Sequence, residues 1–394
     1  MRPTQSLLLS IYIPSFLLAI GQQAIMLLLP LHILQLQGSM GLAAVIVGLR
    51  GLGMMLVDIP AGMLTTRFGD RNAMLGALAA NLVTVLAFAF VHDFVALMII
   101  TVLYGVGSGA WLTARLSYVA DACSPAIRGR AIAALAGIRR GGTLIGPALG
   151  GFLAQVYGYA AAFMMTGVLV VIAIILIALF AGQGAHHEKD TTPHLDRLLG
   201  VLSSNSGAFM TAGMGALTIM LVRAARQLLI PLFGAAIGIN AAAIGLIYSL
   251  SMVVDLMMFY PAGMIMDKRG RRHAAIPCVG LLALSLALLP LTGNFIELLL
   301  VALLAGLGNG LGTGVVMTIG TDLAPLHRRG EFLGVWRLLS DLGSTGAPLL
   351  IGGLTKLCTL AAATFSAAGI GVAGLILFLF VRETRQPHHV ESRE

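Results

Sequence analysis

Hydrophobic residues gather in long runs along this chain, and short polar stretches separate the runs. Twelve of them approach the roughly 20 apolar residues that cross a lipid bilayer. They occupy residues 7–31, 42–63, 73–91, 94–118, 131–155, 160–181, 207–234, 241–263, 274–291, 295–319, 331–355 and 360–381. A helix satisfies its own backbone hydrogen bonds in lipid, whereas an open sheet does not. The pattern therefore predicts an all-α membrane protein with twelve transmembrane helices.

The longest polar stretch, Gly182–Ser206, divides these runs six from six. We expect an N-terminal bundle at 1–181, a cytoplasmic linker with a surface helix at 182–206, and a C-terminal bundle at 207–394. His186, His187 and His194 are typical of a solvated linker, and metal binding is the alternative. The first run is too long for a signal-peptide core, which predicts a retained first span.

Composition supports the membrane class. The chain is 58% hydrophobic and only 10% charged, whereas soluble domains carry about 25% charged residues. This excludes a soluble enzyme. The net charge of +8 reflects membrane orientation, with no nucleic-acid partner expected, because sixteen of the 24 Lys and Arg residues lie at the termini or in loops on one side. Only Lys356 lies on the other side. By the positive-inside rule, both termini are expected in the cytoplasm of a cell whose inner membrane holds the protein.

The chain also repeats itself at a distance of 201 residues. The matched residues are mostly glycine, proline and loop charges: Pro30–Pro231, Pro60–Pro261, Gly62–Gly263, Gly69–Gly270, Arg71–Arg272, Gly105–Gly306, Asp121–Asp322, Gly142–Gly343 and Pro147–Pro348. Two six-helix halves in the same orientation indicate a parallel repeat about an axis along the membrane normal. Such an architecture places a substrate site near the midplane, between the halves.

A short signature follows the second helix of each half. The first copy runs from Gly62 to Arg71 and includes Arg67 and Gly69; the second runs from Gly263 to Arg272 and includes Asp267, Lys268 and Gly270. These segments resemble the loop signature of the major facilitator superfamily, which implies that family's twelve-helix fold and transport activity. Thr66 stands where the family has an aspartate. The resemblance therefore implies that an intact gating latch lies around Asp267.

A third signature lies in the fifth predicted helix. Gly142, Gly146, Pro147, Gly150 and Gly151 resemble the glycine-rich motif of the drug:proton antiporters in this superfamily, which implies export. Glycines four residues apart also form a smooth helix face that allows close packing. The match is partial: Ala133 replaces one glycine of the motif, and the helix-four arginine of that group is missing from Thr101 and Leu103.

Ten ionisable residues lie well inside the predicted spans: Arg50, Asp58, Arg115, Arg139, Arg140, Arg223, Arg226, Asp255, Arg337 and Asp341. Charges inside a membrane are costly and indicate function by default. The family resemblance implies that helix two lies beside eleven and five beside eight. Matching depths then predict three pairs, Asp58–Arg337, Arg50–Asp341 and Arg139–Asp255, either permanent or exchanged during transport.

Four arginines remain without a predicted partner: Arg115, Arg140, Arg223 and Arg226. With Gln22 they form the predicted substrate cavity. Guanidinium groups bind carboxylate and phosphate through paired hydrogen bonds, so the excess favours an anionic or zwitterionic substrate. Some of these side chains could instead snorkel to a helix end. Asp58, Asp255 and Asp341 are the candidates for proton coupling, and no cofactor other than a proton gradient is expected.

These patterns together predict a monomeric secondary transporter, not an enzyme, that exports small amphiphilic molecules in exchange for protons by alternating access. Uptake or exchange of an organic anion or a zwitterionic, lipid-like substrate is the alternative. A non-transporting membrane sensor or scaffold is the alternative from another class. A membrane enzyme would need a nucleophile or metal motif, and an ATP-driven pump a phosphate-binding loop; the sequence contains neither.

Overall fold

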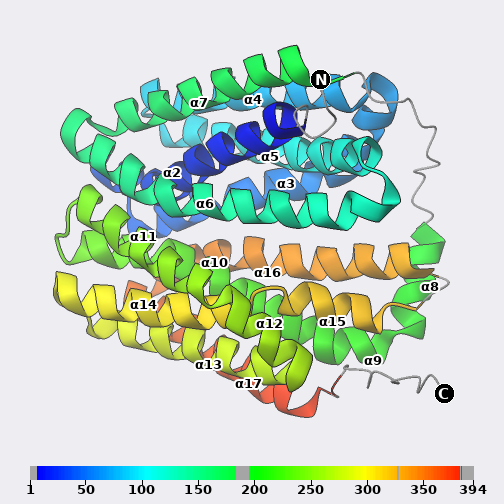
Figure 1. The fold of residues 1–394 in the computed structure, drawn as a ribbon. Coiled ribbons are helices and arrows are strands. Elements are labelled where there is room, and N and C mark those ends of the chain that lie inside the picture. Colours follow the sequence, from blue (N-terminus) through cyan, green and yellow to red (C-terminus); the bar gives the residue numbers. More distant parts are fainter. Residues whose placement is uncertain (1–6, 183–194, 326–327, 382, 384–394) are drawn as a thin grey trace, which may run out of the picture.

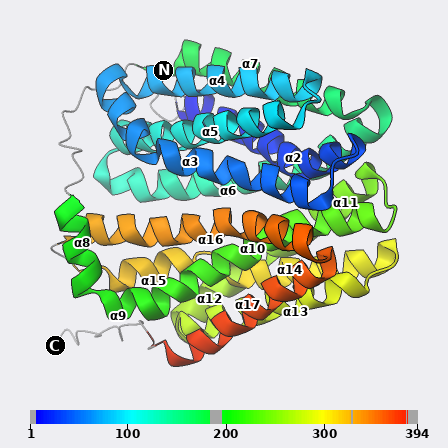
Figure 2. The ribbon, with the colours of Figure 1, turned by 180° about the vertical axis from the view of Figure 1, so that it is seen from behind.

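The computed structural model describes residues 7–182, 195–325, 328–381 and 383, and in them it contains helices and no strands. Figures 1 and 2 show two bundles of long helices, one above the other. The upper bundle holds η1 (Leu8–Tyr12), α2 (Ile13–Gln35), α3 (Met40–Phe68), α4 (Asp70–Phe90), α5 (Phe94–Ala122), α6 (Pro125–Tyr157) and α7 (Tyr159–Phe180).

The second bundle follows α8 (Leu195–Ser204), which lies at the edge of the molecule (Figure 1). It contains α9 (Ser206–Ala208), η2 (Phe209–Gly213), α10 (Met214–Ala236), α11 (Ala241–Met257), α12 (Phe259–Lys268), α13 (Arg272–Leu288), η3 (Leu289–Leu291), α14 (Phe295–Leu311), α15 (Val315–Leu323), α16 (Arg329–Leu357) and α17 (Leu360–Phe380). Residues 183–194 of the predicted linker, with its three histidines, lie outside the described residues.

Local chemistry sets where the helices begin. Ser39, Asp93, Asn240 and Thr359 each accept a hydrogen bond from a backbone N–H three residues ahead, which caps α3, α5, α11 and α17. The repeated signature loops turn at glycines with positive φ, 77° at Gly69 and 105° at Gly270. Side chains rarely adopt such angles, which explains why this glycine recurs in both halves.

Within the described residues, ten helical segments are long and apolar enough to span a membrane. The two remaining predicted spans, α6 and α16, are 33 and 29 residues long. They are long enough to cross a membrane but are less apolar than the other ten, because they carry more charged and polar residues. The reason is their place in the fold: both lie at the boundary between the bundles, where a polar face meets the other half.

Two predicted spans are also interrupted. The eighth breaks at Met258, between α11 and α12, and the tenth breaks at 312–314, between α14 and α15. Gly314 has a φ of 80° and starts α15. Both breaks lie in the C-terminal bundle beside the polar interior, where irregular backbone is tolerated inside a membrane protein.

The bundles meet chiefly through α6 against α11 and α3 against α16, with α2 against α10 between them. These are the neighbours that the family resemblance implied. The closest contacts lie toward the end of the molecule that carries the α2–α3 and α10–α11 connections. A Cβ atom on Gly245 would lie 2.3 Å from the Pro147 carbonyl oxygen, and one on Gly151 would lie 2.4 Å from the Ala241 carbonyl oxygen. The two backbones therefore touch without side chains between them.

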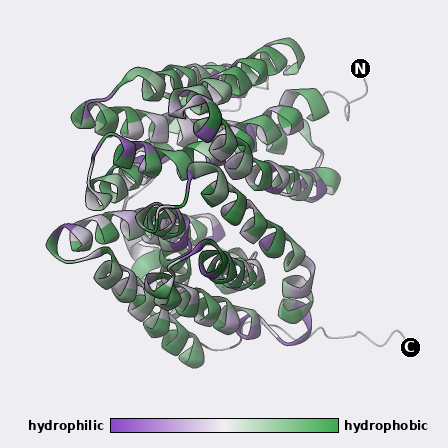
Figure 3. Ribbon diagram, turned by 90° about the vertical axis from the view of Figure 1, so that its left-hand side faces the viewer, coloured by the Kyte–Doolittle hydropathy of each residue, from purple (hydrophilic) through white to green (hydrophobic). Residues whose placement is uncertain are grey.

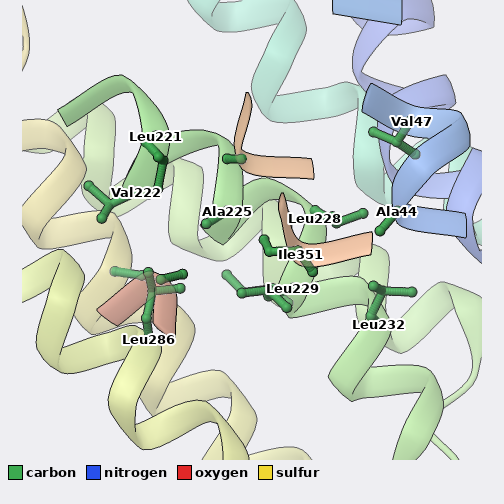
Figure 4. Close-up of a cluster of buried hydrophobic side chains, with 14 of the residues drawn as sticks. Ala44, Val47, Leu221, Val222, Ala225, Leu228, Leu229, Leu232, Leu286 and Ile351 are labelled. Atoms are coloured by element: carbon green, nitrogen blue, oxygen red, sulfur yellow. The ribbon is translucent and has the colours of Figure 1, made fainter. Parts of the chain in front are cut away.

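The apolar packing continues across the boundary. A buried cluster joins Leu228 and Leu232 of α10 to Ala44 and Val47 of α3 and Ile351 of α16 (Figure 4). The outside is apolar as well: Figure 3 shows helices that are largely hydrophobic in that view, and Phe90, Leu179 and Phe380 are among the exposed large side chains. An apolar exterior around a partly polar interior is what a multi-pass membrane protein requires.

Candidate functional site

Two adjoining cavities lie between the bundles. The first, of about 140 Å³, is bounded by α2, α3, α5, α10 and α16 and contains Arg50, Asp58, Arg337 and Asp341. The second, of about 230 Å³, is bounded by α2, α6, α10, α11, α14 and α16. Its polar lining includes Gln23, Arg223, Arg226, Tyr248, Asp255 and Asn309. Both cavities share Ala224, Gln227 and Ser344, so they form one polar interior where the repeat predicts a substrate site.

In the first cavity one arginine serves two carboxylates. The Arg337 guanidinium lies 3.2 Å from the Asp58 carboxylate of the other bundle and 3.5 Å from Asp341 on its own helix. The predicted Asp58–Arg337 pair is confirmed. The predicted Arg50–Asp341 pair is wrong, because Arg337 stands one turn from Asp341 and takes that carboxylate. Arg50 instead lies over the Tyr104 ring, 5.8 Å from its centre.

In the second cavity, each arginine has one neutral oxygen as a hydrogen-bond partner, although the buried Nε atoms of both are unpartnered. Arg223 donates to the Asn309 carbonyl oxygen at 3.2 Å, and Arg226, only 2% exposed, donates to the Ser251 hydroxyl. The Asn309 amide donates in turn to the Asp255 carboxylate, which is 8% exposed. This chain of contacts fixes the polar groups of α10, α11 and α14 relative to one another.

The predicted Arg139–Asp255 pair is wrong. Adjacent residues on an α-helix point about 100° apart, and it is Arg140 that faces the second bundle. Arg140 donates to the Thr313 hydroxyl at 3.3 Å, lies over the Phe259 ring, and is close enough to Asp255 for their opposite charges to attract. Arg139 faces into the N-terminal bundle.

Three arginines of that bundle lack oxygen partners. Arg139 lies close enough to Arg50 and to Arg115 for their positive charges to repel. Arg115 is 3% exposed. Its guanidinium lies over the Trp111 ring, 5.5 Å from the ring centre. Across the described part of the chain, no hydrogen bond or ion pair reaches any of these guanidinium groups. The buried Nε atoms of Arg50 and Arg115 are unpartnered.

The interior is therefore strongly positive. Seven arginines and three aspartates lie well inside the described spans, an excess of four positive charges. Such an interior attracts anions and repels cations. These charges lower the stability of the fold, because each uncompensated ion in a dry interior costs on the order of several kcal/mol of desolvation free energy.

Sequence reasoning missed several lining residues. Gln23 lines the second cavity, whereas the predicted Gln22 lines neither. Asn309, Ser251 and Tyr248 hold the cavity arginines or their partners and were not predicted. Their signal was weak, because a serine or asparagine in a small-residue helix is also typical of helix packing. The charged residues were conspicuous only because charges are rare in lipid.

The helix-five glycines pack as their spacing indicates. Added Cβ atoms on Gly142, Gly146 and Gly150 would collide with α2, and one on Gly151 would collide with α11. Two glycine-bearing faces of α6 thus pack closely, one against α2 of its own bundle and the other against α11 of the second bundle. Pro147 lies at the bundle contact, and the next residue, Ala148, donates its backbone N–H to the Ser249 hydroxyl of α11 at 3.0 Å.

The signature loops are held differently from the prediction. In the second copy, Arg271 pairs with Asp322 at 2.9 Å, and Glu383 accepts hydrogen bonds from the backbone N–H groups of Arg271 and Arg272. Asp267 makes no hydrogen bond or ion pair with any described residue, so the contacts that hold this loop come from Asp322 and Glu383, and the latch around Asp267 stays a prediction. Glu383 follows the end of α17, and its carboxylate lies directly against Gly270 at the turn of this loop.

In the first copy Arg71 donates to the Ala178 carbonyl oxygen at 2.6 Å, and Arg67 lies over the Phe68 ring. Gly62 and Gly263 face open space, so close packing does not explain their repetition. Lys268 borders an open surface pocket of about 300 Å³ with Pro261 and Met264. In the described residues, no three histidine, cysteine or acidic side chains gather as a metal site would require.

Comparisons with known proteins agree with this architecture. The family model described as Major Facilitator Superfamily matches residues 11–222 and again 212–394. The 3-(3-hydroxy-phenyl)propionate transporter of Escherichia coli (strain K12) is 28% identical over 351 residues, covering 84% of this chain and 82% of the relative. Multidrug resistance protein MdtH of Klebsiella pneumoniae (strain 342) is 25% identical, covering 78% of this chain and 77% of the relative.

Solved structures share the fold at lower identity. The peptide transporter POT in complex with sulfate superposes with a TM-score of 0.76 at 17% identity, covering 95% of this chain and 93% of that one. A mutant of the nucleoside transporter NupG superposes with a TM-score of 0.74 at 14% identity, covering 95% of this chain and 98% of that one. At such identities the likeness concerns the arrangement of helices and not the substrate.

Proposed function

The chain belongs to the major facilitator superfamily, and from this premise we propose that it exports small amphiphilic organic anions in exchange for protons. It is a multi-pass membrane transporter of small molecules and not an enzyme. The observation that carries the anion proposal is the interior excess of four positive charges. Arginine binds carboxylate and phosphate through paired hydrogen bonds, so this charge also supplies the recognition chemistry. One relative is named for an aromatic propionate, itself an organic anion.

Export of less charged, drug-like molecules is the second candidate. Met26, Met54 and Met55 line the first cavity, and Met220 and Met252 line the second. Methionine adapts its shape and is polarisable, which suits sites that accept varied apolar ligands. The multidrug resistance relatives and the helix-five glycine motif favour export as the direction.

Proton coupling is assigned to the interior carboxylates. Arg337 contacts Asp58 across the bundle boundary and Asp341 on its own helix, so separation of the bundles would leave Arg337 with Asp341 alone. Asp255 lies between Asn309 and Arg140, where an entering anion would compete for the arginine. Asp58, Asp255 and Asp341 are therefore the candidates for the group that exchanges a proton during transport.

The membrane setting completes the proposal. We place both termini in the cytoplasm and the protein in the inner membrane because of its positively charged loops, and we expect it to act as a monomer. The cavity then lies between the bundles, and alternating access proceeds by rocking one bundle against the other.

The test is flux in proteoliposomes with an imposed pH gradient. Labelled phenylpropionate, a neutral phenylpropanol and the cationic dye ethidium are offered to the wild-type protein, and empty liposomes give the background. Arg128→Gln removes an exposed charge at the start of α6, outside the interior, and should transport like the wild-type protein. We expect gradient-driven flux of phenylpropionate and none of ethidium. Flux of ethidium alone would overturn the anion proposal in favour of cationic drug export.

A further inference from the structure

The second cavity presents opposite charges to the same space. Arg223 and Arg226 line it from α10, and Asp255 lines it from α11. These are the charged groups among its described lining residues. Arg226 is 2% exposed and Asp255 is 8% exposed, so both are almost wholly buried. A ligand that fills the cavity therefore meets two cationic donors and one anionic acceptor.

Each of these three side chains keeps a buried polar atom without a partner. The Asn309 amide donates to Oδ2 of Asp255, whereas no described residue donates to Oδ1. The Nε atoms of Arg223 and Arg226 likewise have no acceptor among the described residues, although each arginine donates once through a terminal nitrogen. Buried polar atoms without partners are costly, and a ligand that supplies the missing groups removes that cost.

One residue sets the spacing between the two kinds of charge. Arg223 donates to the backbone carbonyl oxygen of Asn309 at 3.2 Å, and the side-chain amide of the same asparagine donates to Asp255. The guanidinium and the carboxylate are therefore no farther apart than one asparagine and its two hydrogen bonds. A ligand that bridges them needs its anionic group and its hydrogen-bond donor only a few covalent bonds apart.

We propose that the second cavity selects a hydroxy acid, whose carboxylate binds Arg223 and Arg226 and whose hydroxyl, on the carbon next to that carboxylate, donates to Asp255. This deepens the proposed anion transport and rests on it. A guanidinium pairs well with a carboxylate. An ionised aspartate only accepts hydrogen bonds, so the ligand group that faces Asp255 has to be a donor.

Charge decides between a hydroxyl and an ammonium as that donor. Both groups can donate to Asp255, but an ammonium would also face Arg223 and Arg226, which line the same cavity. Like charges in a site of low polarity repel strongly, whereas a neutral hydroxyl avoids this repulsion. The arrangement therefore favours a hydroxy acid over an amino acid of the same shape.

The apolar part of such an acid also finds a suitable lining. Met220 and Met252 line the second cavity together with Tyr248. Ala224 is shared with the first cavity, where Met54 is part of the lining. Methionine adapts to ligands of varied shape. The contacts therefore specify the polar end of the substrate closely and leave its apolar end variable.

Three acids of one shape test the proposal. Phenylpropionate, phenyllactate and phenylalanine carry a hydrogen, a hydroxyl and an ammonium, respectively, on the carbon next to the carboxylate. Their dissociation constants are measured calorimetrically on the purified full-length protein at about pH 7, where all three carboxylates are ionised. We expect the better enantiomer of phenyllactate to bind about tenfold or more tightly than phenylpropionate, which leaves Asp255 unpaired. Phenylalanine is expected to bind more weakly than phenyllactate.

A variant assigns the preference to Asp255. Asp255→Ala is expected to lower the phenyllactate-to-phenylpropionate affinity ratio to about one, whereas Asp267→Ala, which removes an exposed acid outside both cavities, should keep the wild-type ratio. The ratio cancels general effects of the lost charge, because both ligands carry the same carboxylate and ring. The comparison of ligands on wild-type protein needs no variant, so it stays decisive if Asp255→Ala fails to fold.

The outcomes separate this inference from the proposed function. Binding and transport of phenylpropionate with no preference for phenyllactate would leave anion transport standing and overturn the hydroxy-acid site. Tighter binding of phenylalanine than of phenyllactate would overturn it in favour of a zwitterion. An equal gain from para-hydroxyphenylpropionate, whose hydroxyl lies at the far end of the ring, would overturn the short spacing. Failure of all these acids to bind would overturn both proposals.

Discussion

The two halves of this transporter share a scaffold but not an interior. Positions 201 residues apart keep the same glycines and prolines, yet their polar residues differ: Arg50 corresponds to Ser251, Met54 to Asp255, Asp58 to Phe259, and Arg140 to Asp341. Each interior arginine of the C-terminal half has at least one oxygen partner, whereas three arginines of the N-terminal half have none among the described residues. Repetition thus preserved how the helices turn and pack, while each half acquired its own chemistry.

This difference indicates separate tasks. Arginines held by Asn309 and Ser251 are already ordered, so an incoming anion meets preset donors. Arginines without partners carry an unrelieved cost of burial, which a ligand can relieve. The C-terminal half is therefore suited to orientation and proton exchange, and the N-terminal half to attraction of charge.

The largest effect is expected at the carboxylate that distinguishes the C-terminal interior. Asp255→Asn removes the charge opposite Arg140, and we expect pH-gradient-driven anion flux to fall by about thirtyfold or more. Proteoliposome flux with and without the gradient measures this. Asp267→Asn, an acid of the same half outside both cavities, is the control. Normal gradient-driven flux through Asp255→Asn would show that coupling lies in the other half or elsewhere.

The shared scaffold is tested where the halves touch. Gly245→Ala places a Cβ against the Pro147 carbonyl oxygen of the other half, and the resulting overpacking should lower the free energy of unfolding by about 1–3 kcal/mol. Thermal unfolding in detergent measures the change. Gly346→Ala, also within a boundary helix but with open space around its Cβ, is the matched control and should be neutral or slightly stabilising. Equal effects of both variants would refute the backbone contact.

Matched arginine substitutions test the contrast between the halves directly. Arg115→Met removes a buried charge without an oxygen partner and is expected to raise the free energy of unfolding by about 1 kcal/mol or more. Arg226→Met breaks the contact with Ser251 and is expected to lower it by about 1 kcal/mol. Denaturant titration in mixed micelles, without added anions, measures both. If both variants changed the free energy of unfolding in the same direction, the proposed contrast between the arginines of the two halves would be wrong.

The smallest effect is expected in the signature loop. Asp322→Asn removes the partly exposed pair with Arg271 and should cost no more than about 1 kcal/mol, less at high salt. Asp267→Asn should leave the melting temperature unchanged, since its carboxylate has no partner among the described residues. Melting temperatures at two salt concentrations check both. A larger loss from Asp267→Asn than from Asp322→Asn would support a latch at Asp267 after all.

The scaffold could be predicted because its determinants are local or periodic. Apolar runs indicated the spans, and the repeat with the family resemblance implied the neighbours α3–α16 and α6–α11. The ion pairs were harder, because depth along a helix says nothing about direction around it. Arg139 and Arg140 differ by one position and face different bundles. Asn309 and Gln23 escaped notice because uncharged polar residues in a helix carry little signal until a cavity is seen beside them.

Under the proposed rocking of the bundles, the close backbone contact at Gly151 and Gly245 would be the pivot. From Gly151 back to Pro125, α6 runs for about 26 residues, or about 39 Å at the rise of an α-helix. A rotation of about 10° about this contact would move the far end of α6 by about 7 Å, while the touching backbones would hardly shift. Few contacts near the pivot need to break for the far end to open. The positions of Gly151 and Gly245 thus place the pivot near one end of α6, so that the opposite end would move furthest.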